Sequence, residues 1–148
     1  MRRVVLLALL SCLLYAKPVD LGEKVSPMTL PDQFGKKHRI DASSCPVLLI
    51  TAQKDVSIRL KDFILKQHPD FLQRHHACFL SDIHEMPGFV TRWFALPKMR
   101  KYPFKVLLIY EKGRNPFPVR EDAVTALTLG KGNVVTSIRY VKDPDKLF

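Results

Sequence analysis

The sequence is poor in the features that mark several large protein classes. It has three cysteines and one tryptophan among 148 residues, and it contains neither internal repeats nor a low-complexity tract. It also lacks a glycine-rich loop between a strand and a helix, because Gly130-Lys131-Gly132 falls between two expected strands. These absences argue against a nucleotide-binding fold, a repeat protein and a scaffold held together by many disulfides, and we expect no cofactor.

An apolar run long enough to cross a membrane is missing as well. The strongest run follows Arg2-Arg3, ends at Ala16 and is about 13 residues long, whereas a spanning helix needs roughly 20. Two positive charges, an apolar stretch and a small final residue are typical of a secretory signal peptide. We therefore predict that residues 1–16 are a signal peptide. Residues 17–148 would then be a single domain, periplasmic or secreted, with no transmembrane span.

Cys12 leaves a second interpretation of this segment open. Leu9-Leu10-Ser11-Cys12 resembles a bacterial lipobox, in which the cysteine becomes a lipidated N-terminus. Leu10 fits that motif poorly, and the apolar run continues past Cys12. A lipid-anchored envelope protein is therefore the minority alternative.

Acidic residues are outnumbered by basic ones. The chain has 24 Lys and Arg against 14 Asp and Glu, and its net charge of +10 falls to +8 when Arg2 and Arg3 leave with the signal peptide. The basic residues are spread along the chain rather than gathered on one element with interleaved aromatics, which is the pattern of nucleic-acid binding. We expect the partner to be a protein or peptide of the cell envelope and not nucleic acid, with a weak attraction to lipid head groups.

Apolar runs and turn residues predict an α/β domain of the order hairpin, then β-α-β-α-β-β. Three continuous apolar runs are typical of strands buried on both faces of a parallel sheet. The expected strands are Val47–Ala52, Ala77–Ile83 and Lys105–Tyr110, the expected helices are 57–67 and 88–95, and the flanking hairpins are 28–40 and 123–141. We place Phe89, Trp93, Phe94 and Met99 in the core.

Two sets of polar residues are candidates for a chemical site. His75-His76 precedes the second strand and His84 follows it, so these histidines should lie at opposite ends of the sheet and bind no metal. Asp55, Asp82 and His84 should fall at the carboxyl end of the strands, where a carboxylate–histidine pair could serve as an acid–base pair. We favour Asp55 as a helix N-cap, because no nucleophile accompanies it.

Three stretches follow one another in a recognisable order: a hairpin at residues 21–36, a strand and helix start at 47–58, and a second crossover at 82–109. Together they resemble the thioredoxin-like superfamily, nearest its peroxiredoxin and periplasmic-thioredoxin branch. The resemblance covers about residues 21–141 and implies a thioredoxin-like core whose C-terminal helix is short or absent. It also places the family's cis-proline at Pro103.

The sequence departs from this family where its chemistry resides. The dithiol motif would fall at Asp55-Val56-Ser57-Ile58, which contains no cysteine. A thiolate is the nucleophile in dithiol exchange, and neither aspartate nor serine replaces it. We therefore predict a non-catalytic binding or accessory protein whose ligand site lies around Asp55, Ser57, Tyr102 and Pro103.

Cys45 and Cys78 stay in the mature chain. Because the resemblance makes their strands parallel neighbours, both cysteines should lie at one end of the sheet, within reach of a disulfide. Two buried free thiols are the alternative. An atypical thiol-dependent oxidoreductase using Cys45 or Cys78 is the main rival function.

Overall fold

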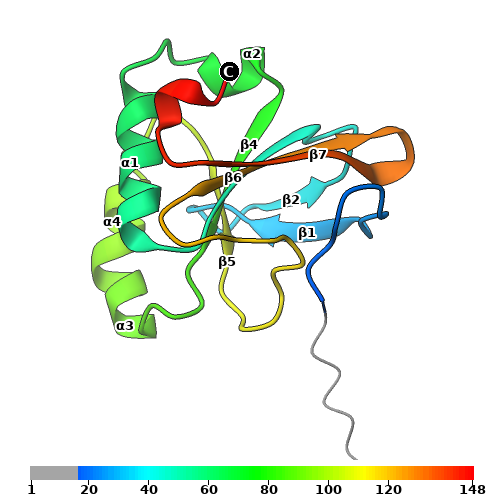
Figure 1. Cartoon of the computed structure of the whole chain (residues 1–148). Helices are drawn as coiled ribbons and strands as arrows, with labels where there is room; N and C mark the ends of the chain where they lie inside the picture. Colours follow the sequence, from blue (N-terminus) through cyan, green and yellow to red (C-terminus); the bar gives the residue numbers. More distant parts are fainter. Residues whose placement is uncertain (1–16) are drawn as a thin grey trace, which may run out of the picture.

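Five strands form the central sheet of the computed structural model, which describes residues 17–148 (Figure 1). The strand order is β5-β4-β3-β6-β7, with β3, β4 and β5 parallel and β6 and β7 antiparallel. Their bounds are β3 Val47–Thr51, β4 Ala77–Asp82, β5 Val106–Ile109, β6 Val124–Gly130 and β7 Val134–Val141. The continuous apolar runs become the three parallel strands because both faces of the sheet are covered.

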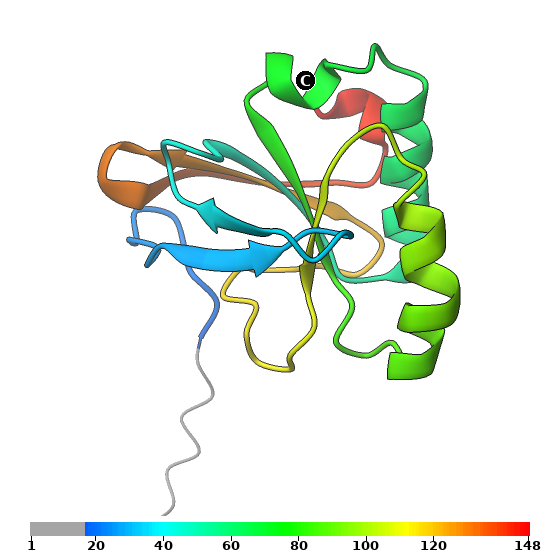
Figure 2. The same ribbon diagram turned by 180° about the vertical axis from the view of Figure 1, so that it is seen from behind.

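Helices cover one face of the sheet (Figures 1 and 2). The first crossover is α1 (Lys54–Leu65) followed by the short α2 (Phe71–Arg74). The second is a continuous helical stretch made of α3 (Gly88–Val90), η1 (Thr91–Ala95) and α4 (Leu96–Met99), which we call the outer helix, residues 88–99. One apolar core, with Leu49, Leu60, Phe79 and Leu108 among its members, fills the space between helices and sheet.

The N-terminal hairpin covers the other face. It consists of β1 (Met28–Pro31) and β2 (Lys37–Ile40), and it buries Leu30 and Ile40 against the alternate side chains of the sheet. Strand side chains alternate between faces, so Leu48 and Ile50 point into this second core while Leu49 points into the first. The predicted α/β class with an N-terminal hairpin is confirmed.

The outer helix contains a π-turn. The N–H of Leu96 donates to the carbonyl of Thr91, five residues back, and Pro97 follows at once. Proline has no N–H and crowds the preceding turn, so the wider turn is where the helix accommodates it. The helix predicted at residues 88–95 therefore extends to Met99.

The chain ends with a short 3₁₀ turn, η3 (Pro144–Lys146), so the C-terminal helix is short, as expected. Residues 131–133 turn the chain between β6 and β7 (η2, Lys131–Asn133), with left-handed backbone at Gly132 and Asn133. Across residues 17–148, the helices are all too short or too polar to cross a membrane. The predicted signal peptide and Cys12 lie outside the described residues.

Candidate functional site

A cleft of about 660 Å³ lies between α1 and the outer helix, over β4 and β5. Its walls are mainly apolar: Ile58 from α1, Phe79, Ile83 and Val106 from the sheet and the segment after β4, and Met86, Val90, Phe94, Met99 and Tyr102 from the second crossover. Because α1 begins at the carboxyl end of β3, one end of the cleft coincides with the edge where open α/β sheets bind ligands.

Hydroxyl groups form a polar floor at this end of the cleft. The Ser57 hydroxyl shares a hydrogen bond of 2.6 Å with that of Thr51, and it lies 3.3 Å from the hydroxyl of Ser81. Thr51 and Ser81 are buried, whereas Ser57 is half-buried and faces the cleft. The partners of Ser57 are hydroxyls rather than a base, so its oxygen suits hydrogen bonding to a ligand better than nucleophilic attack.

Charged side chains of both signs line the cleft, with three lysines and two acidic residues. Lys54, Lys61 and Lys98 line the cleft together with the acidic residues Asp82 and Glu85. The hydrogen bond that Lys61 donates to the carboxylate of Asp62 raises the pKa of Lys61, and burial is the main cause of a raised pKa at Tyr102. At neutral pH Lys61 is therefore a cation and Tyr102 a neutral donor.

The structure brings two of the four predicted site residues together. Ser57 and Tyr102 line the cleft, whereas Asp55 and Pro103 do not. Asp55 is exposed in the first turn of α1, and the N-cap is Gln53, so the prediction that Asp55 caps the helix is wrong. The helix starts earlier than expected, at Lys54, which moves Asp55 inside its first turn, where a negative charge still suits the helix dipole.

The prediction of a cis peptide at Pro103 is also wrong, since the described backbone contains no cis bond. The topology of the sheet explains the error. Pro103 precedes β5, an edge strand that runs parallel to β4, so this proline lies near the amino ends of the parallel strands and not beside the start of α1. The strand that runs antiparallel beside β3 is β6, and the residues before it are Asp122-Ala123.

The residue that lies beside the start of α1 is Asp122, not Pro103. Its N–H donates to Oε1 of Gln53 at 2.7 Å, and its carboxylate accepts from Arg59 at 2.5 Å. Asp122 has a left-handed backbone, with φ of 58°. The loop before β6 is therefore tied to α1 by polar side chains that sequence reasoning did not single out.

The carboxylate–histidine pair exists, but its hydrogen bonds are structural. Asp82 lies 2.7 Å from Nδ1 of His84, and its other oxygen accepts from Asn115 at 3.0 Å. Both carboxylate oxygens are thus engaged, and they fasten the end of β4 to the loop after β5. Residues 17–148 contain no group of three His, Cys, Asp or Glu that could hold a metal.

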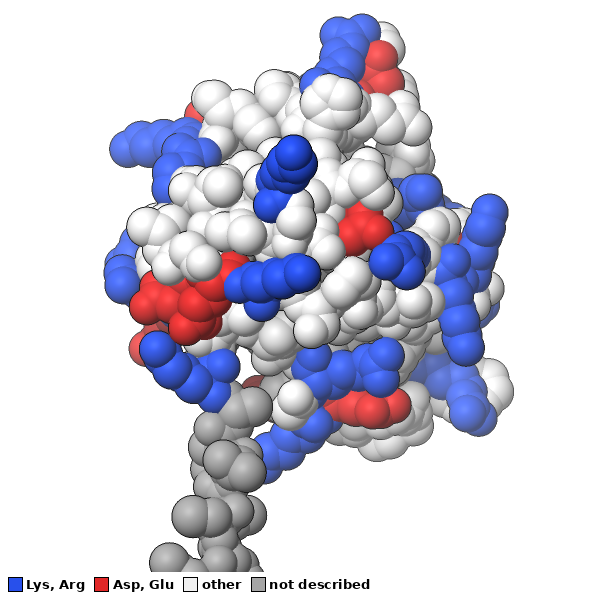
Figure 3. Space-filling view, turned by 90° about the vertical axis from the view of Figure 1, so that its right-hand side faces the viewer, with Lys and Arg blue, Asp and Glu red and all other residues white. Residues whose placement is uncertain are grey.

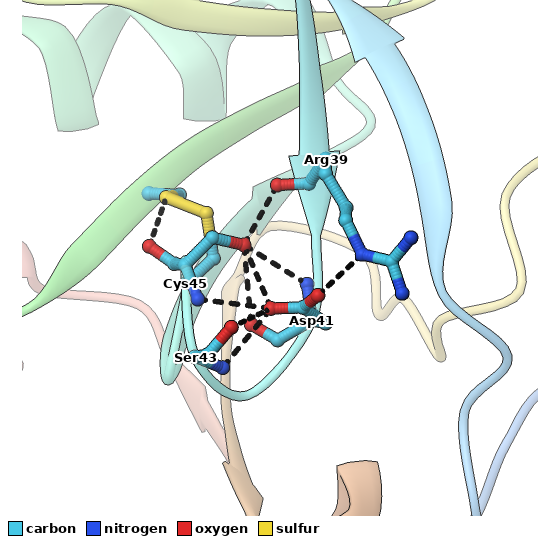
Figure 4. The surroundings of a disulfide bond; sticks show 6 residues. Arg39, Asp41, Ser43 and Cys45 are labelled. Atoms are coloured by element: carbon cyan, nitrogen blue, oxygen red, sulfur yellow. Dashed lines mark hydrogen bonds and ion pairs between the residues drawn. A yellow bond between two sulfur atoms is a disulfide. The ribbon is translucent and has the colours of Figure 1, made fainter.

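The two cysteines form a disulfide at the opposite end of the sheet (Figure 4). Cys45 precedes β3 and Cys78 is the second residue of β4, with Cα atoms 5.6 Å apart. The register pairs Leu48 with Cys78, which brings the start of β4 beside the approach to β3. The predicted bridge between Cys45 and Cys78 is thus present.

A polar corner surrounds this disulfide. Asp41 accepts hydrogen bonds from the backbone and hydroxyl groups of Ser43 and Ser44 and from Nε of Arg39. These bonds, first that from the Ser43 hydroxyl and then that from Arg39, hold the pKa of Asp41 well below its usual range. Figure 4 shows this network enclosing the turn that leads into Cys45.

The structure corrects the assignment of three aromatic residues to the core. Phe89, Trp93 and Phe94 are 65%, 71% and 60% exposed, although Met99 does pack partly against the first core. The helical spacing of these residues indicated an apolar face, but that face points to solvent and toward the cleft instead of into the core.

Gln33 is a structural residue that the sequence did not reveal. Its buried side chain donates to the carbonyls of Met99 and Phe104, at 3.2 and 2.8 Å, and accepts from the N–H of Val106 at 2.9 Å. A side chain of the hairpin turn thereby fixes the connection that carries Tyr102 and Pro103.

Comparison with solved structures identifies the architecture. Similar structures include a thio-disulfide isomerase from Thermus thermophilus (17% identity, TM-score 0.53, 87% of this chain and 92% of that one). A peroxiredoxin-like protein from Aquifex aeolicus (9%, 0.51, 87% and 80%) and a putative electron transport protein from Aquifex aeolicus VF5 (12%, 0.52, 86% and 92%) are also similar. The sequence matches no protein-family model and no curated protein. At these identities the likeness concerns the fold alone, and the chain has a thioredoxin-like fold with an N-terminal hairpin.

Proposed function

We propose that this is an exported binding or accessory protein of the bacterial envelope, which holds its ligand in the cleft between α1 and the outer helix and performs no dithiol exchange. The observation that carries the proposal is the separation of the cleft from the sulfur atoms. The cleft lies on the helix-covered face of the sheet and reaches the carboxyl end of β3, whereas both cysteines pack in the core on the hairpin face, near the amino end of β3.

The separation is large on the scale of chemical contact. Val47 to Thr51 spans β3, and four residue steps of about 3.3 Å give roughly 13 Å between the ends of this strand. Cys45 lies before the strand, and the start of α1 has no cysteine from 52 to 58. A ligand on the hydroxyl floor would therefore meet Ser57 rather than a thiolate.

The lining of the cleft suggests the class of ligand. Its apolar walls suit aliphatic or aromatic groups, and its lysines suit a carboxylate. A peptide segment that combines apolar and acidic side chains has both. This supports a protein or peptide partner from the envelope.

An anionic aromatic probe tests the cleft directly. We expect anilinonaphthalene sulfonate to bind, because it joins an apolar ring system to a negative charge. Ile58→Glu should weaken the fluorescence titration about tenfold or more by adding charge to a wall. Leu65→Glu is the matched control, since Leu65 lies on the same helix outside the cleft and is 45% exposed, against 42% for Ile58. Equal loss in both variants, or no binding at all, would refute a ligand cleft here.

Export has its own test. N-terminal sequencing of the protein recovered from the envelope should give a start near Lys17. A chain that keeps Met1 in the cytoplasm would refute it, and a lipidated Cys12, visible in the intact mass of the membrane fraction, would establish the anchored alternative.

The second candidate is redox chemistry at Cys45–Cys78, favoured by the presence of the disulfide and by the half-buried position of Cys78. A redox-active bond exchanges with small thiols in the folded protein, whereas a structural bond resists them. Incubation of the folded protein with millimolar glutathione, followed by alkylation and mass measurement, separates the two. We expect the bond to survive unless denaturant is added.

A further inference from the structure

The outer helix presents large apolar side chains to solvent. Phe89 and Trp93 are four residues apart, one helical turn, so they lie on neighbouring parts of one face. Both are more than three-fifths exposed, and Phe94, which also lines the cleft, is 60% exposed. Large exposed apolar side chains gathered on one short helical stretch point to an interaction site, whereas single scattered ones do not.

The position of the outer helix leaves this surface accessible. In Figures 1 and 2 the stretch 88–99 and α1 lie along the same margin of the molecule, and the sheet lies on their inner side. Within residues 17–148, no other element lies over its outward side. Phe89 and Trp93 are therefore on an outward edge of the molecule, and Phe94 lies where this edge meets the cleft.

The chain segment that carries these aromatic residues has basic but no acidic side chains. Residues 86–105 contain no Asp or Glu and five basic residues, all exposed: Arg92, Lys98, Arg100, Lys101 and Lys105. Glu85 stands just before this segment, and Arg100 is partly engaged with the carbonyl of Gln33. On the face in Figure 3, by contrast, acidic and basic side chains are interspersed.

We propose that the outer helix is a docking site for an anionic phospholipid surface. Trp and Phe insert at the boundary of head groups and acyl chains, and Lys and Arg around them attract anionic head groups. Phe89 and Trp93 lie outside the cleft, on an outward edge, and such an edge suits a bilayer surface better than a peptide. This inference does not depend on a ligand in the cleft, although docking would bring the cleft mouth, through Phe94, to the membrane surface.

The chain contains its own reporter, because Trp93 is the sole tryptophan. The test uses protein starting at Lys17, which contains the whole described fold and no apolar leader. We expect vesicles of 30% phosphatidylglycerol in phosphatidylcholine to shift Trp93 emission to shorter wavelength. Pure phosphatidylcholine should bind at least about 20-fold more weakly, since each cation near an anionic surface contributes about a fivefold factor.

Variants separate the insertion of aromatic side chains from the electrostatic attraction of the basic residues to the head groups. Phe89→Ser should lower the partition coefficient at least about tenfold by removing buried apolar area. Its matched control is Phe34→Ser, because Phe34 is 60% exposed on the hairpin at the other side of the sheet. Arg92→Glu with Lys98→Glu should weaken binding more than Lys112→Glu with Lys131→Glu, two exposed cations elsewhere.

Circular dichroism verifies that each variant is folded. Three results would overturn the proposal: no shift with anionic vesicles, equal binding to neutral and anionic vesicles, or equal losses in the Phe89 and Phe34 variants. A shift that grows with protein concentration in the absence of lipid would assign the surface to self-association instead and overturn the proposal as well.

Discussion

The two ends of the sheet differ in how they are held. At the amino end, a disulfide joins β3 to β4, and Asp41 gathers hydrogen bonds from the turn before Cys45. At the carboxyl end, α1 and the outer helix enclose an open cleft with a floor of neutral hydroxyls. The covalent cross-link thus lies on the other face of the sheet from the cleft, which allows stability and binding to be changed separately.

Removal of the disulfide should have the largest effect. The bond closes a loop of 33 residues, so Cys45→Ala with Cys78→Ala should lower the free energy of unfolding by about 3–4 kcal/mol. Urea denaturation measures the loss. Binding of anilinonaphthalene sulfonate to the folded variant should be unchanged, and a parallel loss of affinity would contradict the independence of the two ends.

Substitution of Gln33 should have the second-largest effect on the free energy of unfolding. Gln33→Leu leaves the N–H of Val106 and two carbonyls without their partner in a buried position, which should cost about 2 kcal/mol. Gln67→Leu is the control, because the Gln67 side chain makes a single hydrogen bond, of 3.3 Å, to the carbonyl of Phe63. Chemical denaturation should show a change of less than about 0.5 kcal/mol for the control.

Asp41 should make the amino end sensitive to acid. Its pKa is lower in the folded chain than in the unfolded chain, so its stabilisation is present above about pH 4 and is lost as the pH falls further. Asp41→Asn should therefore flatten the dependence of unfolding free energy on pH between about pH 4 and pH 2. An unchanged slope in that window would show that Asp41 is not the group responsible.

The smallest effect belongs to the cleft floor. Ser57→Ala removes the hydroxyl closest to the buried Thr51, which keeps only a weak 3.5 Å contact to the carbonyl of Leu80. We expect a loss of about 1 kcal/mol or less in thermal unfolding. A loss as large as that of the disulfide variant would show that the carboxyl end is as tightly constrained as the amino end.

Sequence predicted the parts of the fold that depend on local pattern. The apolar runs of β3, β4 and β5 required burial on both faces, and neighbouring parallel strands brought Cys45 and Cys78 within reach. The proline assignment failed because two apolar strands follow the outer helix. Pattern alone does not show that β6, rather than β5, lies beside β3.

The cleft and the aromatic edge were harder to predict for a different reason. Trp93 and Phe94 are apolar at helical spacing, and the exposure of that face depends on where the π-turn sets the outer helix relative to α1. The backbone groups that the Gln33 side chain binds lie 66 to 73 residues away in sequence. Long-range contacts of this kind leave no local pattern.

The most direct measurement is an insulin-reduction assay with dithiothreitol as electron donor. The protein starting at Lys17 is compared with its Cys45→Ala, Cys78→Ala variant and with a buffer blank. Our account predicts that both proteins match the blank, because no thiol lies at the start of α1. Turnover above the blank in the wild type that disappears in the double variant would contradict it and place the chemistry at the amino end of the sheet.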